Sequence, residues 1–148
     1  MTVDRAILLL SLLLSLPPSA GAALGGPASS VEDDRAHMQA ERKSTAAQRY
    51  AVHEITTPSG TVVREFVSPD TGKVFAVTWH GPFMPDLRQV LGDHFATFAE
   101  GTAGAARRAA SVRTPEVVIH SAGHMRAFSG MAYLPGQIPR DVQIEDIR

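Results

Sequence analysis

Histidine is the side chain best able to carry chemistry in this chain, whose 148 residues include six histidines and no cysteine. The lack of cysteine excludes disulfides, thiolate metal sites and cysteine nucleophiles. His120 and His124 lie closest together in the sequence, and a tight turn over residues 121–123 would bring their rings together, as a zinc or copper site requires. On one continuous strand they would lie about 13 Å apart and could not share an ion. The pair is a weak metal-site candidate, and two half-exposed histidines beside a turn are the simpler interpretation.

A hydrolytic site is the other chemistry that residues near this pair could perform. Ser121 would be the nucleophile and His124 the base, with Asp93 or Asp86 orienting the imidazole. The sequence lacks a strained G-x-S-x-G turn and a glycine-rich oxyanion loop, and it contains no P-loop, dinucleotide-binding fingerprint or EF-hand loop. We therefore predict no catalytic residue and no cofactor, and we favour a protein that is not an enzyme.

The run WHGPFMP at residues 79–85 has the most distinctive composition in the chain. Its glycine and prolines predict a rigid connection from a strand end to a helix, with the tryptophan in the core. Aromatic residues and methionine are also favoured at binding hot spots, so the run is a candidate rim for a protein partner. The candidate contacts are Trp79, His80, Phe83 and Met84.

An uncharged apolar run, AILLLSLLLSL, occupies residues 6–16. Arg5 precedes it and the small residues AGA at 20–22 follow it, which is the pattern of a secretory signal peptide. A membrane-spanning helix needs about 20 apolar residues, so we expect no stable membrane anchor. We predict a signal peptide over residues 1–22, cleaved after Ala22 or Ala23, and a periplasmic or secreted protein.

The charges of the chain are balanced, with 14 Lys and Arg against 15 Asp and Glu. A net charge of -1 gives no electrostatic reason to expect nucleic acid as a partner. The one basic cluster, Arg107, Arg108 and Arg113, lies in a small-residue stretch that predicts a solvated linker.

After residue 22 the chain has 12 valines and 5 isoleucines against four leucines, and valine and isoleucine favour sheet over helix. Three β-rich runs at 49–55, 61–67 and 73–79 are joined by turns that contain proline and glycine, which predicts an antiparallel meander. Alternation along the third run predicts Phe75, Val77 and Trp79 on one face. The run is apolar on both faces, so we expect it at the centre of the sheet with cover on each side. Runs at 115–121 and 125–134 predict two more strands.

One amphipathic helix is predicted over residues 86–99, because apolar residues recur there at helical spacing behind a capping Asp86. Leu91 and Phe95 should face the sheet. Residues 100–114 read as a flexible linker, and residues 135–148 as a loosely attached tail.

A second helix is predicted near the start of the mature chain. Ser29 could cap it, and the acids Glu32, Asp33 and Asp34 suit the positive end of a helix dipole. Its apolar stripe is thin, so we expect it to be peripheral. Residues 23–148 are thus predicted to form a single α+β domain, with an antiparallel sheet of about five strands and one amphipathic helix on a face.

Four segments of the chain carry a family resemblance: LGGPASSVEDDRAHMQ, HEITTPSGTVVREFVSP, KVFAVTWHGPFMPDLRQVLGDHF and SAGHMRAFSGMAYLP. They resemble the family called domain of unknown function 2844, a family of small exported proteobacterial proteins. The resemblance covers nearly the whole mature chain. It implies export and no established activity, so it assigns no catalytic residue.

The function that the sequence favours is an exported accessory or binding protein of the cell envelope. One alternative is a small metal-binding protein or metal-dependent enzyme that uses His120 and His124. A second is a structural subunit that pairs through an exposed strand edge.

Overall fold

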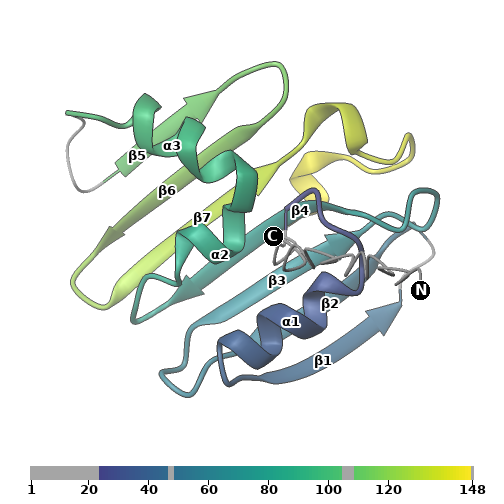
Figure 1. Ribbon diagram of the computed structural model, residues 1–148, viewed down its shortest axis with the longest axis horizontal. Helices are drawn as coiled ribbons and strands as arrows, with labels where there is room; N and C mark the ends of the chain where they lie inside the picture. The colour runs from purple at the N-terminus through teal and green to yellow at the C-terminus, as the bar shows by residue number, and fades with distance from the viewer. Residues whose placement is uncertain (1–23, 47–48, 105–108, 148) are drawn as a thin grey trace, which may run out of the picture.

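The computed structural model describes residues 24–46, 49–104 and 109–147. In these ranges the chain is an α+β fold on one seven-stranded antiparallel sheet, with the strand order β1-β2-β3-β4-β7-β6-β5 (Figure 1). The strands are β1 (Glu41–Ala46), β2 (Ala51–Thr56), β3 (Val62–Val67), β4 (Val74–Gly81), β5 (Ala109–Arg113), β6 (Val118–His124) and β7 (Ala127–Tyr133). The predicted signal peptide, as well as Arg107 and Arg108, lies outside the described residues.

The predicted meander is confirmed as β2, β3 and β4, which pair in sequence order. β4 is the middle strand of the seven and pairs with β7 on its other side, as its two apolar faces predict. One register shift, at Phe66 and Val67, changes the expected facing of Phe75. We expected Phe75 to share a face with Trp79, but it packs with Phe66 on the opposite face of the sheet.

The sheet has seven strands instead of the expected five or so, because the sequences of both edge strands did not indicate strands. β1 was expected to continue the N-terminal helix, and β5 was expected to be part of a flexible linker over residues 100–114. Both expectations are wrong, because these segments gain their hydrogen bonds from the strands beside them, β2 and β6.

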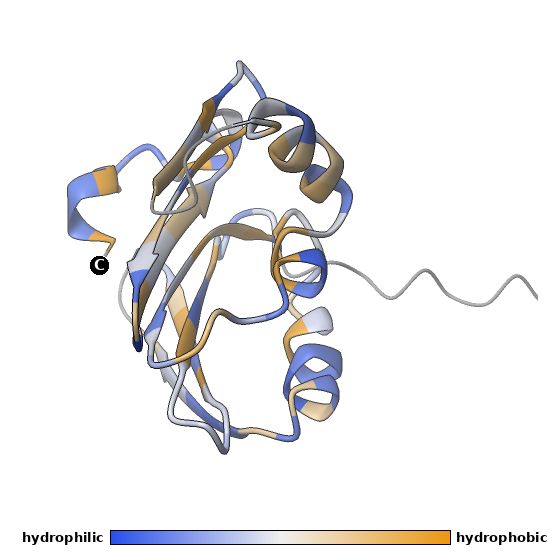
Figure 2. Cartoon of the chain, turned by 90° about the vertical axis from the view of Figure 1, so that its left-hand side faces the viewer, coloured by the Kyte–Doolittle hydropathy of each residue, from blue (hydrophilic) through white to orange (hydrophobic). Residues whose placement is uncertain are grey.

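Four helical elements cover one face of the sheet, as Figures 1 and 2 show. They are α1 (Ser30–His37), α2 (Leu87–Leu91), η1 (Gly92–His94) and α3 (Phe95–Gly101). Asp86 caps α2 as predicted, since its Oδ1 accepts a hydrogen bond of 2.9 Å from the Arg88 backbone N–H. The single helix expected over residues 86–99 is instead interrupted at Gly92, which has a φ of 51°.

α1 is not peripheral, contrary to the sequence-based expectation. It packs between β1–β3 and solvent, and it buries Ser30, Val31 and Asp34. Ser29 makes no side-chain cap, and the Ser30 hydroxyl instead donates to the Pro27 carbonyl at 2.7 Å. A helix with so thin an apolar stripe is held by Val31 and by polar contacts, described below.

The C-terminal segment packs on the opposite face of the sheet (Figure 2). Its short turn η3 (Ile144–Asp146) lies there, and Val142 and Ile147 are buried against Phe66 and Phe75. The turn before it, η2 (Pro135–Gln137), borders the helix-covered side, where Gly136 and Gln137 lie near His94. The expectation of a loosely attached tail is therefore wrong. The cover predicted for both faces of β4 comes from the helices on one side and from this segment on the other.

Trp79 fills the helix-covered side of the sheet centre and is 1% exposed. Its indole lies against Gly130, where any Cβ would collide with the ring. Gly130 therefore marks the close approach of the Trp79 ring to β7. A glycine inside a strand can also indicate a bulge, but β7 pairs at Gly130 without a register shift. In the described part of the chain, no helix is long and apolar enough to span a membrane.

Candidate functional site

The sheet face opposite the helices is covered only at one end, and we call it the open face. The strand registers place a row of side chains across it, with one residue from each strand. We call this row the polar row: Lys43, Glu54, Arg64, Thr78, Met131, His120 and Ser111.

A groove of about 700 Å³ lies on the open face over β4, β7, β6 and β5. This volume falls within the range of about 300–1,000 Å³ that is typical of small-molecule sites. Small side chains form much of the floor, which is why the surface is hollow here, and Ile147 of the C-terminal segment closes one end. The lining includes Arg64, Thr78, His80, Ala109, Ser111, His120, Ala122, Ser129, Met131 and Ile147.

Two hydrogen bonds fix polar side chains along the groove. The Arg64 Nε donates to Glu54 Oε2 at 2.8 Å. On the other side, Ser111 Oγ and His120 Nδ1 lie 2.9 Å apart. The polar groups of the groove are thus positioned by neighbours in the polar row before any ligand arrives.

The structure separates the two histidines that formed the metal-site candidate. His120 and His124 both lie on β6, and the hairpin turn comes after them, at Arg126 with a φ of 63°. The turn expected over residues 121–123 is wrong, so the two side chains stand four residues apart on one strand, about 13 Å by strand geometry. Ser121 is buried on the helix-covered face and lies apart from His124, which is exposed.

The four candidate partner contacts divide between core and surface. Trp79 belongs to the core, whereas His80 is exposed and lines the groove. Phe83 and Met84 are 51% and 39% exposed, and the Met84 sulfur lies 4.0 Å from the Ser121 hydroxyl on the helix-covered side. The run at residues 79–85 therefore contributes to both faces of the molecule and does not form one rim.

Two buried carboxyl groups face each other beneath α1. Asp34 of α1 and Glu65 of β3 are both 0% exposed. The Gln89 side-chain amide donates to Asp34 Oδ1. If both acids were ionised, Asp34 Oδ2 and both Glu65 oxygens would have no hydrogen-bond donor among the described residues. A single proton held between the two carboxyl groups supplies the missing donor.

Burial, followed by the charge of Asp34, raises the pKa of Glu65 to about 9. Burial also raises the pKa of Asp34, against the opposing effect of its hydrogen bonds with Gln89 and Glu65. At neutral pH Glu65 is therefore the protonated member and donates to Asp34. This pair attaches α1 to the middle of the sheet.

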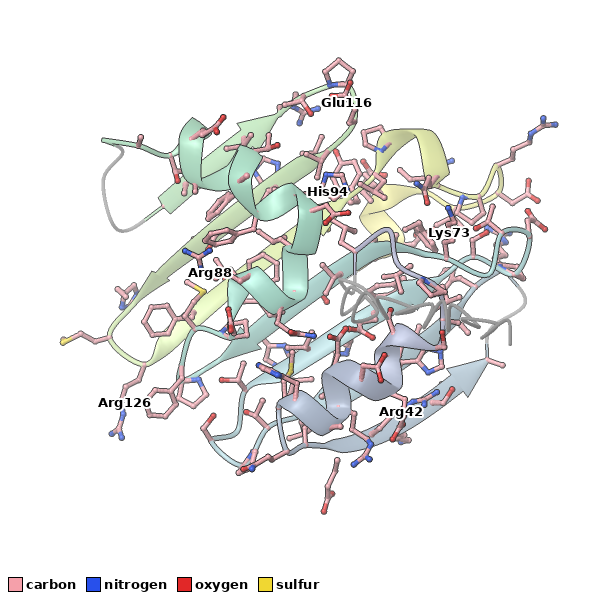
Figure 3. The ribbon with its side chains drawn as sticks, in the orientation of Figure 1. Arg42, Lys73, Arg88, His94, Glu116 and Arg126 are labelled. Atoms are coloured by element: carbon pink, nitrogen blue, oxygen red, sulfur yellow. The ribbon has the colours of Figure 1, made fainter. Side chains whose placement is uncertain are left out.

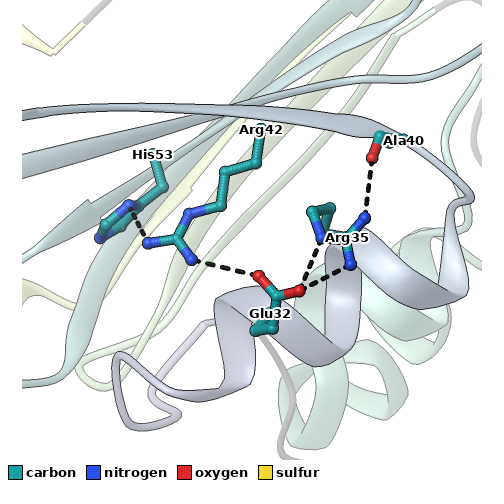
Figure 4. Close-up of polar contacts among 5 residues, drawn as sticks. All are labelled: Glu32, Arg35, Ala40, Arg42 and His53. Carbon is teal, nitrogen blue, oxygen red and sulfur yellow. Dashed lines mark hydrogen bonds and ion pairs between the residues drawn. The ribbon is translucent and has the colours of Figure 1, made fainter.

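A chain of polar contacts joins α1 to β1 and β2 (Figure 4). Arg42 of β1 contacts Glu32 at 3.3 Å and donates through Nη2 to His53 Nδ1 at 2.9 Å. Burial, with a smaller effect of the Arg42 charge, lowers the pKa of His53, so the ring is neutral and can accept this bond. Arg35 pairs with Glu32 at 2.7 Å, and that hydrogen bond lowers the pKa of Glu32.

A second cavity, of about 600 Å³, lies on the helix-covered side and is lined by Asp93, His94, Glu116 and Gln137 among others. Figure 3 shows His94 and Glu116 on neighbouring elements. Burial lowers the pKa of His94, while the charges of Asp93 and Glu116 oppose that change. Across the described ranges, no three His, Asp or Glu side chains come together in a way that could hold a metal ion.

Residues 20–147 match the model of one protein family, described as Protein of unknown function (DUF2844). The chain belongs to this family. The DUF2844 match begins after the apolar run at residues 6–16 and includes every described strand and helix. The chain matches none of the curated proteins and none of the solved structures compared with it.

Sequence reasoning missed the acid pair and Arg64 of this DUF2844 protein, and it singled out His80 and His120 of the groove for other roles. Glu65 carries a readable signal, because alternation along β3 places it between Val63 and Val67 on the inward face. Asp34 carries none, since three adjacent acids at a helix start already have an explanation in the helix dipole. The groove depends on which small residues of β5, β6 and β7 become neighbours, and that follows from the strand order.

Proposed function

We propose that this chain is an exported binding protein, not an enzyme, and that the groove on its open face holds a small, largely apolar ligand. The observation that carries the proposal is the groove itself: about 700 Å³, with a floor of small side chains and polar groups already fixed by neighbours. The helix-covered face, in contrast, is filled by Trp79, Leu91 and other core residues. A preformed, mostly apolar hollow with a few oriented polar groups is what small-molecule sites require.

Binding of the neutral apolar dye Nile red to the mature chain tests this proposal. Ala122 lies exposed in the groove, so Ala122→Trp should fill it, whereas Thr56→Trp adds the same bulk on the open face outside the groove. We expect saturable binding of one dye per chain by the unmodified protein and by Thr56→Trp. Ala122→Trp should weaken binding at least tenfold. An unmodified protein that binds no dye saturably, or an Ala122→Trp variant that binds normally, would overturn the proposal.

Export is the second part of the proposal. Leu24, which both predicted cleavages would keep, is 2% exposed, and its backbone N–H donates to the Val90 carbonyl at 3.3 Å. We expect N-terminal sequencing of the protein from its native cells to begin at Ala23 or Leu24. A main form that retains Met1 in the cytosol would contradict export.

A structural role through an exposed strand edge remains the second candidate, and β5 favours it. β5 pairs with β6 on one side only in the described part of the chain, and four of its five residues, Ala109 to Val112, are uncharged. The other edge, β1, carries Glu41, Arg42 and Lys43, which discourage pairing. Sedimentation of the mature protein separates the two: a monomer, or a dimer that Ala109→Lys at an exposed position of β5 leaves intact, would argue against pairing at β5.

A further inference from the structure

The lining of the groove contains basic and no acidic side chains, and Glu54 and Asp146 lie beside Arg64 in the adjoining hollow. Among the fourteen lining residues of the groove, all of them in described parts of the chain, the ionisable side chains are Arg64, His80 and His120, and none is acidic. The whole chain has a net charge of -1, so this bias is local and does not follow from composition. A ligand that complements the lining has a negative or hydrogen-bond-accepting group.

Among the basic side chains of the groove, Arg64 is held in place by an ion pair. Its Nε is tied to Glu54 at 2.8 Å, and both side chains are about one-third exposed, at 31% and 35%. Its two terminal nitrogens make no hydrogen bond to the residues that the structure describes. Because a guanidinium presents several N–H groups in a rigid plane, the tie through Nε leaves the outer N–H groups oriented and free for an oxyanion.

The apolar part of the lining lies beside Arg64 and continues away from it. Thr78 is the cross-strand neighbour of Arg64, Met131 follows on β7, and Ile147 closes the end at the C-terminal segment. Small side chains such as Ala122 leave the floor between them low. The groove is thus amphipathic, with a cationic group at its β3–β4 side and an apolar trough over β7, β6 and β5.

We infer that the ligand is a single-chain amphiphile with an anionic head, whose head is received by the terminal nitrogens of Arg64 and whose chain lies in the trough. This inference rests on the proposed function and adds the chemical class of the ligand. His80 and His120 lie farther along the groove and offer ring N–H groups to the head or to water around it. Glu54 acts as a positioning residue, because it holds Arg64 without lining the groove.

Isothermal titration of the mature protein with four ten-carbon amphiphiles, each below its micelle concentration, tests the inference. The ligands are decanoate, decyl phosphate, neutral decanol and cationic decyltrimethylammonium. We expect the two anions to bind at least tenfold more tightly than decanol, and the cation to bind most weakly. The difference between decanoate and decyl phosphate reports which anionic head the site prefers.

Arg64→Gln should weaken the binding of both anions at least tenfold and leave decanol binding unchanged. Arg113→Gln is the matched control, since Arg113 is exposed on the same face of β5 and does not line the groove. It should leave all four affinities unchanged. Raising the salt concentration on the unmodified protein gives a test that needs no variant: it should weaken anion binding and spare decanol.

The outcomes separate this inference from the proposed function. Decanol binding as tight as decanoate binding, or an Arg64→Gln variant that binds decanoate normally, would overturn the anionic head while the binding function stands. If neither the amphiphiles nor Nile red bind, both fall. If Arg64→Gln does not fold, Arg64→Lys keeps the charge and loses the planar fork, and a several-fold loss for anions alone is expected.

Discussion

The two faces of this seven-stranded sheet differ in the side chains they carry and in what those side chains do. The helix-covered face carries large apolar side chains such as Trp79 and Leu91 around one buried acid pair, Asp34 and Glu65. The open face carries the polar row and small side chains, and it is closed only where Val142 and Ile147 pack on it. Stability is concentrated on the first face, and free binding surface on the second.

This difference teaches that polar groups mean opposite things on the two faces. Beneath α1, a charged group is expensive, so two carboxyl groups share a proton and bury one negative charge instead of two. In the groove, Arg64 is partly exposed and pairs with Glu54 at 2.8 Å. Substitutions should therefore change stability on one face and ligand binding on the other.

The largest expected effect is loss of packing on the helix-covered face. Leu91 is 0% exposed within the main core, so Leu91→Ala should lower the free energy of unfolding by about 2–5 kcal/mol. Ser129→Ala, at an exposed site in the groove, should change it by no more than about 0.5 kcal/mol. Urea denaturation of both variants makes the comparison. Equal midpoints would mean that the two faces do not differ in this way.

The second prediction concerns the proton shared by Asp34 and Glu65. The Glu65 pKa is about 9 in the folded protein against 4.5 for the free group, so between these values the folded state holds a proton that the unfolded state releases. Stability due to this group is therefore full below pH 4.5 and is lost as the pH rises toward 9, with a slope of up to about 1.4 kcal/mol per pH unit.

Glu65→Gln removes this titration and keeps an N–H donor toward Asp34. Its stability relative to the unmodified protein should rise steadily from pH 5 to pH 9, as measured by urea denaturation at each pH. Parallel stability curves for the two proteins over that range would show that Glu65 does not hold the proton. Glu41→Gln, at an exposed position on β1, is the control and should give a parallel curve.

The acid pair and the groove also show where sequence reasoning reaches its limit. The meander of β2, β3 and β4 was predictable because each strand carries its own alternation, and Asp86 was predictable as a cap because capping is local. The edge strands β1 and β5 were not, since sequences such as ERKSTA and AASVR become strands only by pairing with β2 and β6.

The candidate site was less predictable than the fold for the same reason. His80 was singled out as a partner contact and His120 as a weak metal ligand, and both line the groove. Arg64 was not singled out, because its role depends on Glu54 lying opposite it on β2 and on Met131 arriving from β7. Neither neighbour is near it in sequence.

The third prediction tests the part of the open face that is covered. Ile147 is 0% exposed and lines one end of the groove. Ile147→Ala should lower the free energy of unfolding by about 2 kcal/mol, near the lower end for buried aliphatic residues, because a segment close to the chain end can relax. It should also weaken Nile red binding. If the variant kept its full stability, the C-terminal segment would be a loosely attached tail, as the sequence predicts.

The smallest expected change in stability gives the sharpest test of the polar row. The pair of Arg64 and Glu54 is partly exposed, so Glu54→Gln should cost at most about 1 kcal/mol. Simple electrostatics predicts that removing this negative charge strengthens the binding of decanoate. If Glu54 positions Arg64, the effect of Glu54→Gln has the opposite sign. The guanidinium loses its fixed orientation, and decanoate binding weakens several-fold while decanol binding is unchanged.

Glu41→Gln is the control, because it removes an exposed carboxylate from the same face outside the groove and should follow simple electrostatics. Tighter decanoate binding by both variants would show that Glu54 contributes only charge, and that the open face is a solvated surface and not a prepared one.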